Sequence, residues 1–185
     1  MHSAVSARPR RAGRLLVPAA VGAVVAIALG VFGAEHSPAK VPYSLGFSSL
    51  FAMKIWLAVG AGALALLQLL SALWMWRRLP LGPPPRWVRP AHRATGTLAF
   101  LTTLPVAYAC LYALGFQHYS TRVLVHSLLG CLFYGAFATK IMIVRGRGLP
   151  AIALPLAGGL LFTLLIAAWL TSGLWFITEN GFPSP

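Results

Sequence analysis

The sequence has almost no acidic residues. Only Glu35 and Glu179 carry a carboxylate side chain among 185 residues, whereas 15 residues are Lys or Arg, and the formal net charge is +13. Catalysis by paired carboxylates and a carboxylate-lined proton path are therefore excluded, because both need acids inside the folded protein. The sequence also lacks a phosphate-binding loop and a metalloprotease motif. We accordingly expect no independent catalytic activity.

Cysteine and charged residues of either sign are scarce as well. The two cysteines, Cys110 and Cys131, form no C-x-x-C motif, which argues against a zinc site or a disulfide scaffold. We interpret both as small packing residues. Charged residues make up 9% of the chain, against about 25% in a typical soluble domain. Such a chain has too few polar groups to cover a water-facing surface, so its expected surroundings are a lipid bilayer.

Long hydrophobic runs fill most of the sequence instead. Crossing the hydrocarbon core of a bilayer, about 30 Å thick, takes roughly 20 helical residues. Five apolar runs reach about this length, and the connections between them are rich in Pro, Gly or Arg. We predict an all-α protein, an integral membrane bundle of five transmembrane helices in one domain at residues 15–176, with a basic arm at 1–14 and a polar tail at 177–185. The expected spans are residues 15–33, 50–76, 92–116, 123–144 and 150–176.

The positive charges predict how the bundle sits in the membrane. Most of the 15 cations lie in the N-terminal arm, in residues 77–93 and in residues 140–147, which share one side of a five-span protein. The expected location is the cell membrane of a bacterium. The positive-inside rule then places the N-terminus in the cytoplasm and both acidic residues outside. Lys54 and Lys140 lie near span ends, from which their ammonium groups can reach the interface. Because the cations stand between apolar runs, we expect no nucleic-acid partner.

The first hydrophobic run also has features of a signal peptide. A basic flank precedes it, and Phe32-Gly33-Ala34 loosely resembles a cleavage site. The apolar run is, however, longer than the 7–15 or so residues of a signal-peptide core, and Phe32 is a poor residue at position −3. We therefore expect an uncleaved helix. Cleavage would leave the other four spans in the same orientation.

Two neighbouring spans open on the same pattern. His92 is followed by Gly96, and His126 by Gly130, with a Leu two residues later and an aromatic residue two after that. An ionisable side chain inside a membrane is costly and is a functional candidate by default, and neutral imidazole is a common haem-iron ligand. A glycine one turn further on the same face leaves room for a flat macrocycle. The pattern predicts haem b bound by His92 and His126 through its iron, with Gly96 and Gly130 beneath the ring.

The two histidines cannot share one haem. Each lies near the start of its own helix, and the short connection at residues 117–122 makes these helices antiparallel neighbours, so the imidazoles are separated by most of a core about 30 Å thick. Two sites at opposite faces, or a symmetric dimer that pairs equivalent histidines, remain open. Simpler roles also remain open: His92 could contact lipid headgroups or water, and His126 could hydrogen-bond to a carbonyl of another helix. Second iron ligands would come from Met75 or Met142 for His92, and from His118, His36 or Met53 for His126, with His118 preferred.

Small residues recur at every fourth position of the fourth span: Ser127, Cys131, Gly135 and Thr139. Such a stripe lets two helix backbones approach closely in a membrane. It supports an alternative function, a non-catalytic structural or assembly subunit of a larger membrane complex, in a homo- or hetero-oligomer. A transporter for a small uncharged solute is a third alternative.

The segments His92-Arg-x-x-Gly96 and His126-Ser-x-x-Gly130 resemble motifs of the transmembrane di-haem cytochrome b class. That resemblance implies an electron-transfer subunit with b-type haem, which exchanges electrons with a quinone or an extracytoplasmic redox partner protein. The class has four helical histidines, whereas the second and fifth spans of this chain contain none. The whole chain, especially Gly130-Cys-Leu-Phe-Tyr-Gly-Ala-Phe, also resembles an uncharacterised family of small actinobacterial multi-pass membrane proteins. That second resemblance implies no activity.

Overall fold

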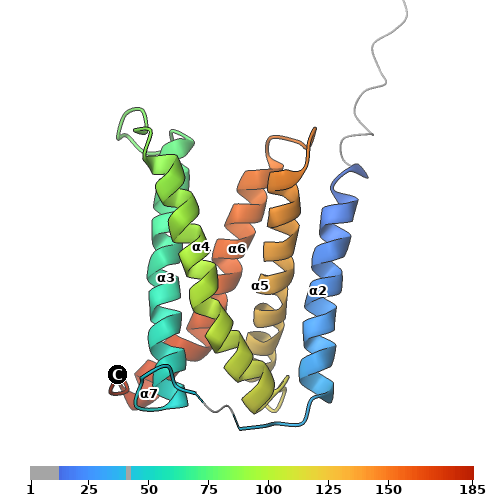
Figure 1. The fold of residues 1–185 in the computed structure, drawn as a ribbon, viewed down its shortest axis with the longest axis vertical. Coiled ribbons are helices and arrows are strands. Elements are labelled where there is room, and N and C mark those ends of the chain that lie inside the picture. Colours follow the sequence, from blue (N-terminus) through green and yellow to red (C-terminus); the bar gives the residue numbers. More distant parts are fainter. Residues whose placement is uncertain (1–12, 41–42) are drawn as a thin grey trace, which may run out of the picture.

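The computed structural model describes residues 13–40 and 43–185. This part of the chain folds into five long helical segments without a strand (Figure 1). Each segment is long and apolar enough to cross a membrane. The prediction of an all-α, five-helix membrane bundle is confirmed, and the chain is an integral membrane protein. The helices are α2 (Leu16–Glu35), α3 (Leu50–Met75), α4 (Val88–Ala109) with the π-helix η1 (Cys110–Leu114), α5 (Thr121–Arg145), and α6 (Ala153–Trp169) with the π-helix η2 (Leu170–Leu174) and α7 (Trp175–Asn180).

Helix ends differ from the expected spans by a few residues. α4 begins at Val88 rather than at residue 92, because Pro90 fits the first turn of a helix, where its missing N–H is not needed. The last helical segment begins at Ala153 and continues to Asn180, where Gly181, at φ 75°, ends it. The expected tail is therefore shorter than residues 177–185. Most of the expected basic arm, residues 1–12, lies outside the described part of the chain.

Large apolar side chains cover the outside of the bundle. Val24 on α2, Leu66 on α3 and Leu101 on α4 are 65%, 51% and 50% exposed. Contiguous apolar surface of this kind is unusual on a water-soluble monomer but is what a lipid bilayer contacts. The exposed side chains therefore agree with the assignment of these helices as membrane spans.

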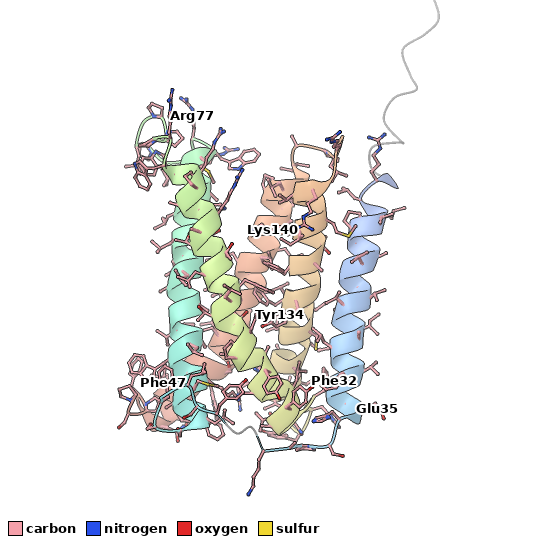
Figure 2. The ribbon with its side chains drawn as sticks, in the orientation of Figure 1. Phe32, Glu35, Phe47, Arg77, Tyr134 and Lys140 are labelled. Carbon is pink, nitrogen blue, oxygen red and sulfur yellow. The ribbon has the colours of Figure 1, made fainter. Side chains whose placement is uncertain are left out.

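The connections gather at two opposite ends of the bundle. We call the end with residues 76–87 and 146–152 the basic end, and the end with residues 36–40, 43–49, 115–120 and the C-terminus the distal end (Figure 1). Figure 2 places Arg77 at the basic end, Lys140 just inside it, and Glu35 at the distal end. The cationic connections thus share one side, as the charge pattern predicts.

Small residues join α2 to α5. A Cβ atom added to Gly22 would collide with the Thr139 hydroxyl and the Gly135 carbonyl, and one added to Gly135 would collide with the Gly22 carbonyl. The Thr139 hydroxyl donates a hydrogen bond of 3.1 Å to the Pro18 carbonyl oxygen. The basic-end half of the small-residue stripe is therefore occupied within the chain, by α2, and is not free for another subunit.

The remaining helices pair in a way that separates α4 from α5. α4 packs along α3, whereas α5 packs against α2 and α6. α4 and α5 are antiparallel, as expected, but they meet through side chains at mid-depth: the rings of Phe100 and Phe137 stack with centroids 3.7 Å apart. The Tyr134 hydroxyl also donates to the Thr103 carbonyl oxygen at 3.0 Å. This separation leaves space inside the distal half of the bundle.

Candidate functional site

A cavity of about 390 Å³ occupies the distal half of the bundle. It lies between α3, α4, α5 and α6, and both π-helical segments contribute to its wall, Cys110 and Leu114 from η1 and Ser172 and Gly173 from η2. π-helical turns are rare and occur frequently at functional sites. The lining is largely apolar with a few polar groups, which is the usual character of a small-molecule site of a few hundred Å³.

His126 lines this cavity with one ring nitrogen already bonded. Its Nδ1 lies 3.1 Å from the Ala168 carbonyl oxygen and 3.3 Å from the Thr171 hydroxyl. A carbonyl oxygen only accepts, so Nδ1 carries the proton and donates. Nε2 of the neutral ring then keeps its lone pair, and it has no hydrogen-bond partner within the described residues. The site thus presents one imidazole acceptor to whatever enters the cavity.

The second π-helix helps to orient His126. Arg122, one turn before it on α5, donates from Nη1 to the Thr171 carbonyl oxygen at 2.7 Å, and its guanidinium lies 3.6 Å from the Trp175 ring centroid. The wider turn of a π-helix disturbs the usual backbone hydrogen bonds, so carbonyls near η2 can accept from α5 side chains. Arg122 and Lys54 both line the cavity, where they supply positive charge near its distal end.

Trp169 also lines this cavity, and its indole N–H is packed against Gly173. Its Nε1–H is buried and has no hydrogen-bond partner among the described residues. The indole lies against Gly173, where an added Cβ atom would come within 2.9 Å of Nε1. A buried, unpaired N–H is unfavourable, so a ligand oxygen that accepted from it would contribute to binding.

Tyr134 lines the cavity toward mid-depth, and its ring makes edge contacts with Phe100 and Phe133. Cys110 and Cys131 also contribute to the wall, and both are free thiols. They fit the interpretation as small packing residues.

The first histidine motif has different surroundings. Nδ1 of His92 lies 2.7 Å from the Ser71 hydroxyl of α3, and Gln68 donates to the His92 carbonyl oxygen at 2.6 Å. A Cβ atom added to Gly96 would come within 2.8 Å of the Gln68 side-chain oxygen. Gly96 therefore accommodates Gln68 rather than open space, and neither His92 nor Gly96 lines the distal cavity.

The second motif does reach the cavity. His126 and Gly130 both line it, and a Cβ atom added to Gly130 would meet nothing within 4 Å. The proposed second iron ligands lie elsewhere: His118 is exposed in the turn before α5, Met53 is fully buried, and the His36 ring stacks on Phe32. The cavity wall contains no second His and no Met, so it offers an iron atom one imidazole. The described residues also contain no cluster of three or more His, Cys, Asp or Glu suited to a metal ion.

Sequence reasoning missed three residues of this geometry, Gln68, Trp169 and Arg122. Gln68 could have been noticed, because an amide in the middle of an apolar span needs a partner. Trp169 resembled an ordinary membrane aromatic, and Arg122 resembled a turn cation.

No curated protein and no solved structure matches this chain significantly. One protein family does match, described as a family of unknown function (DUF6529), over residues 15–184. The matched region includes α2, whose glycine contact with α5 holds it in the bundle. Because the match runs over nearly the entire chain, the protein belongs to this family of unknown function.

Proposed function

We propose that the protein is a quinone-linked electron-transfer subunit of the bacterial cell membrane, with the quinone ring bound in the distal cavity. One observation carries the proposal: His126, which has a free acceptor at Nε2, and Trp169, which has an unpaired Nε1–H, line the same apolar cavity. A quinone ring has the matching chemistry, with an apolar body and two oxygens that accept as carbonyls or donate as hydroxyls.

The chain's own residues have defined tasks in this proposal. A bound quinol would supply two electrons and two protons as it becomes a quinone. His126 accepts a proton from the ring hydroxyl at Nε2, while its Nδ1–H remains bonded to the Ala168 carbonyl. The second proton leaves the opposite ring oxygen to water at the distal end, and Trp169 donates a hydrogen bond to that oxygen. Lys54 and Arg122 stabilise negative charge on the ring oxygens. The electrons pass to a one-electron carrier on the distal side, a haem or iron–sulfur partner protein.

Haem b at His126 is the second candidate. A ligating histidine commonly donates its other N–H to a carbonyl, as His126 does, and Gly130 leaves the space that a macrocycle needs. The cavity wall provides no second His or Met, so a haem would receive one axial ligand from this chain. A reduced-minus-oxidised absorption spectrum of the protein purified from its own host separates the candidates, because only haem gives a b-type band.

Binding of decylubiquinone to the purified protein tests the first candidate. We expect quinone to quench tryptophan fluorescence saturably, and His126→Ala to weaken binding about ten-fold, the effect of losing a well-placed hydrogen bond and leaving its partner unpaired. His118→Ala is the matched control, because it removes an exposed imidazole outside the cavity. Equal affinities for the wild type and His126→Ala would contradict the proposal.

A further inference from the structure

Lys140 is a cation without a counter-ion inside a membrane span. It is partly buried on α5, five residues before the helix ends at Arg145. The only acidic side chains of the chain are Glu35 and Glu179, and both lie at the distal end together with the C-terminus. No carboxylate of this protein can therefore pair with Lys140. Cations within spans are costly and are normally paired, so an anion from outside the chain is expected there.

α4 does not pack closely along α5, the helix that carries Lys140. The Phe100–Phe137 stack and the Tyr134–Thr103 hydrogen bond join the two helices at mid-depth. Lys140 follows Phe137 by three residues, almost one helical turn closer to the basic end. The next residues along α5 are apolar and accessible, since Ile141 and Val144 are 36% and 58% exposed. A charged head and an apolar flank thus lie side by side.

The rim above Lys140 is also positive. Exposed arginines surround the basic end, and no carboxylate lies among them: Arg77, Arg78, Arg86, Arg89, Arg93, Arg145 and Arg147. Their combined potential attracts anions, and basic pockets between transmembrane helices are typical sites of anionic lipid headgroups. A free phosphate ion satisfies the charge but not the apolar flank, whereas a phospholipid satisfies both.

We propose that Lys140 binds the phosphate of one anionic phospholipid, taken from the leaflet at the basic end, with its acyl chains along the accessible apolar face of α5. The rim arginines concentrate such lipids near the site, and Lys140, which lies deeper, holds one of them. This site is separate from the quinone cavity and does not depend on it.

Native mass spectrometry of the full-length protein in detergent tests this proposal, with dioleoyl phosphatidylglycerol and dioleoyl phosphatidylcholine as probes. We expect one phosphatidylglycerol molecule to bind in preference to phosphatidylcholine. Lys140→Gln should weaken that first binding event about five-fold or more, and Lys140→Arg should restore it, because one cation near a lipid headgroup is worth about this factor. Arg77→Gln is the control, since it removes the same charge from the exposed rim.

Three outcomes would overturn the proposal. The two lipids could bind equally, Lys140→Gln could retain the preference of the wild type, or Arg77→Gln could lose as much affinity as Lys140→Gln, which would indicate general attraction by the rim. Replacing Lys140 with Gln removes an unpaired charge and keeps a flexible polar side chain, so the variant is expected to fold. Lys140→Arg gives an independent comparison at the same position.

Discussion

The side chain of Trp169 has a buried N–H that donates to no acceptor among the described residues. Replacing it by Phe removes the donor and keeps an aromatic ring. We expect Trp169→Phe to weaken decylubiquinone binding about five-fold, because a neutral hydrogen bond contributes about 1 kcal/mol. The midpoint of thermal unfolding should not fall, since the wild-type N–H makes no hydrogen bond within the described part of the protein that the substitution would remove. Equilibrium dialysis and circular dichroism in detergent measure the two quantities.

Trp56→Phe is the matched comparison for that prediction. Its Nε1–H donates to the Pro183 carbonyl oxygen at 3.1 Å, and its ring contacts Phe182, so this tryptophan holds the C-terminal segment against α3. We expect Trp56→Phe to lower the unfolding midpoint and to leave quinone binding unchanged. The opposite pattern in the two variants would show that Trp169 has a packing role and no role in binding.

At the scale of single residues, the sequence could nominate candidates but could not assign them different surroundings. His92 and His126 open the same pattern, yet Gly96 accommodates Gln68 while Gly130 faces open space. The difference comes from what each glycine faces: Gly96 faces a side chain of α3, and Gly130 faces the cavity. Spacing along one helix contains no information about what its neighbour presents.

Among the helices, the contact between α2 and α5 depends on glycine. We expect Gly22→Ala to destabilise the protein by about 1–3 kcal/mol, the usual cost of overpacking, because the new methyl group would overlap the Gly135 carbonyl. Gly60→Ala on α3 is the control, since its methyl group would meet nothing within 4 Å, and it should stabilise by up to about 1 kcal/mol. Unfolding by SDS titration measures both; equal stabilities would contradict the predicted contact.

The pairing of α3 with α4 depends on a polar contact. Gln68 donates to the His92 carbonyl oxygen and to the Thr95 hydroxyl, at 2.6 and 2.5 Å. We expect Gln68→Leu to lower the free energy of unfolding by about 0.6–2 kcal/mol, the range of interhelical hydrogen bonds in membranes. Quinone binding, at the other end of the bundle, should be unaffected. A variant as stable as the wild type would show that the amide contributes nothing to this pairing.

The helices themselves were largely predictable, because run length and Pro or Gly punctuation determine where a span begins and ends. Their partners were not. The short turn before α5 suggested that α4 would be its neighbour, but the glycines of α2 allow a closer approach to α5 than α4 achieves. The π-helical segments η1 and η2 carry no pattern that distinguishes them from the α-helices they extend.

For the whole molecule, charge predicts orientation in the membrane. The basic end should face the cytoplasm and the C-terminus the exterior. We expect alkaline phosphatase to be active when fused after Pro185 and inactive when fused within residues 81–86, with the reverse pattern for a fluorescent-protein reporter of the cytoplasm. Activity of the phosphatase in the 81–86 fusion would reverse the orientation. The proposed lipid would then come from the outer leaflet, and the proposed redox partner would bind on the cytoplasmic side.

The π-helix η2 has a consequence for how the cavity can arise in evolution. Each residue of an α-helix turns the chain by about 100°, and a π-helical turn contains an additional residue relative to it. Loss of a single codon within Leu170–Leu174 would therefore rewind η2 as ordinary α-helix and leave the helical segments on either side of it in register. The Thr171 carbonyl would return to its own helix, and His126 would lose the neighbour that helps to orient it. A hollow of this kind can thus arise or vanish in one mutational step, without any change to the rest of the membrane-spanning scaffold.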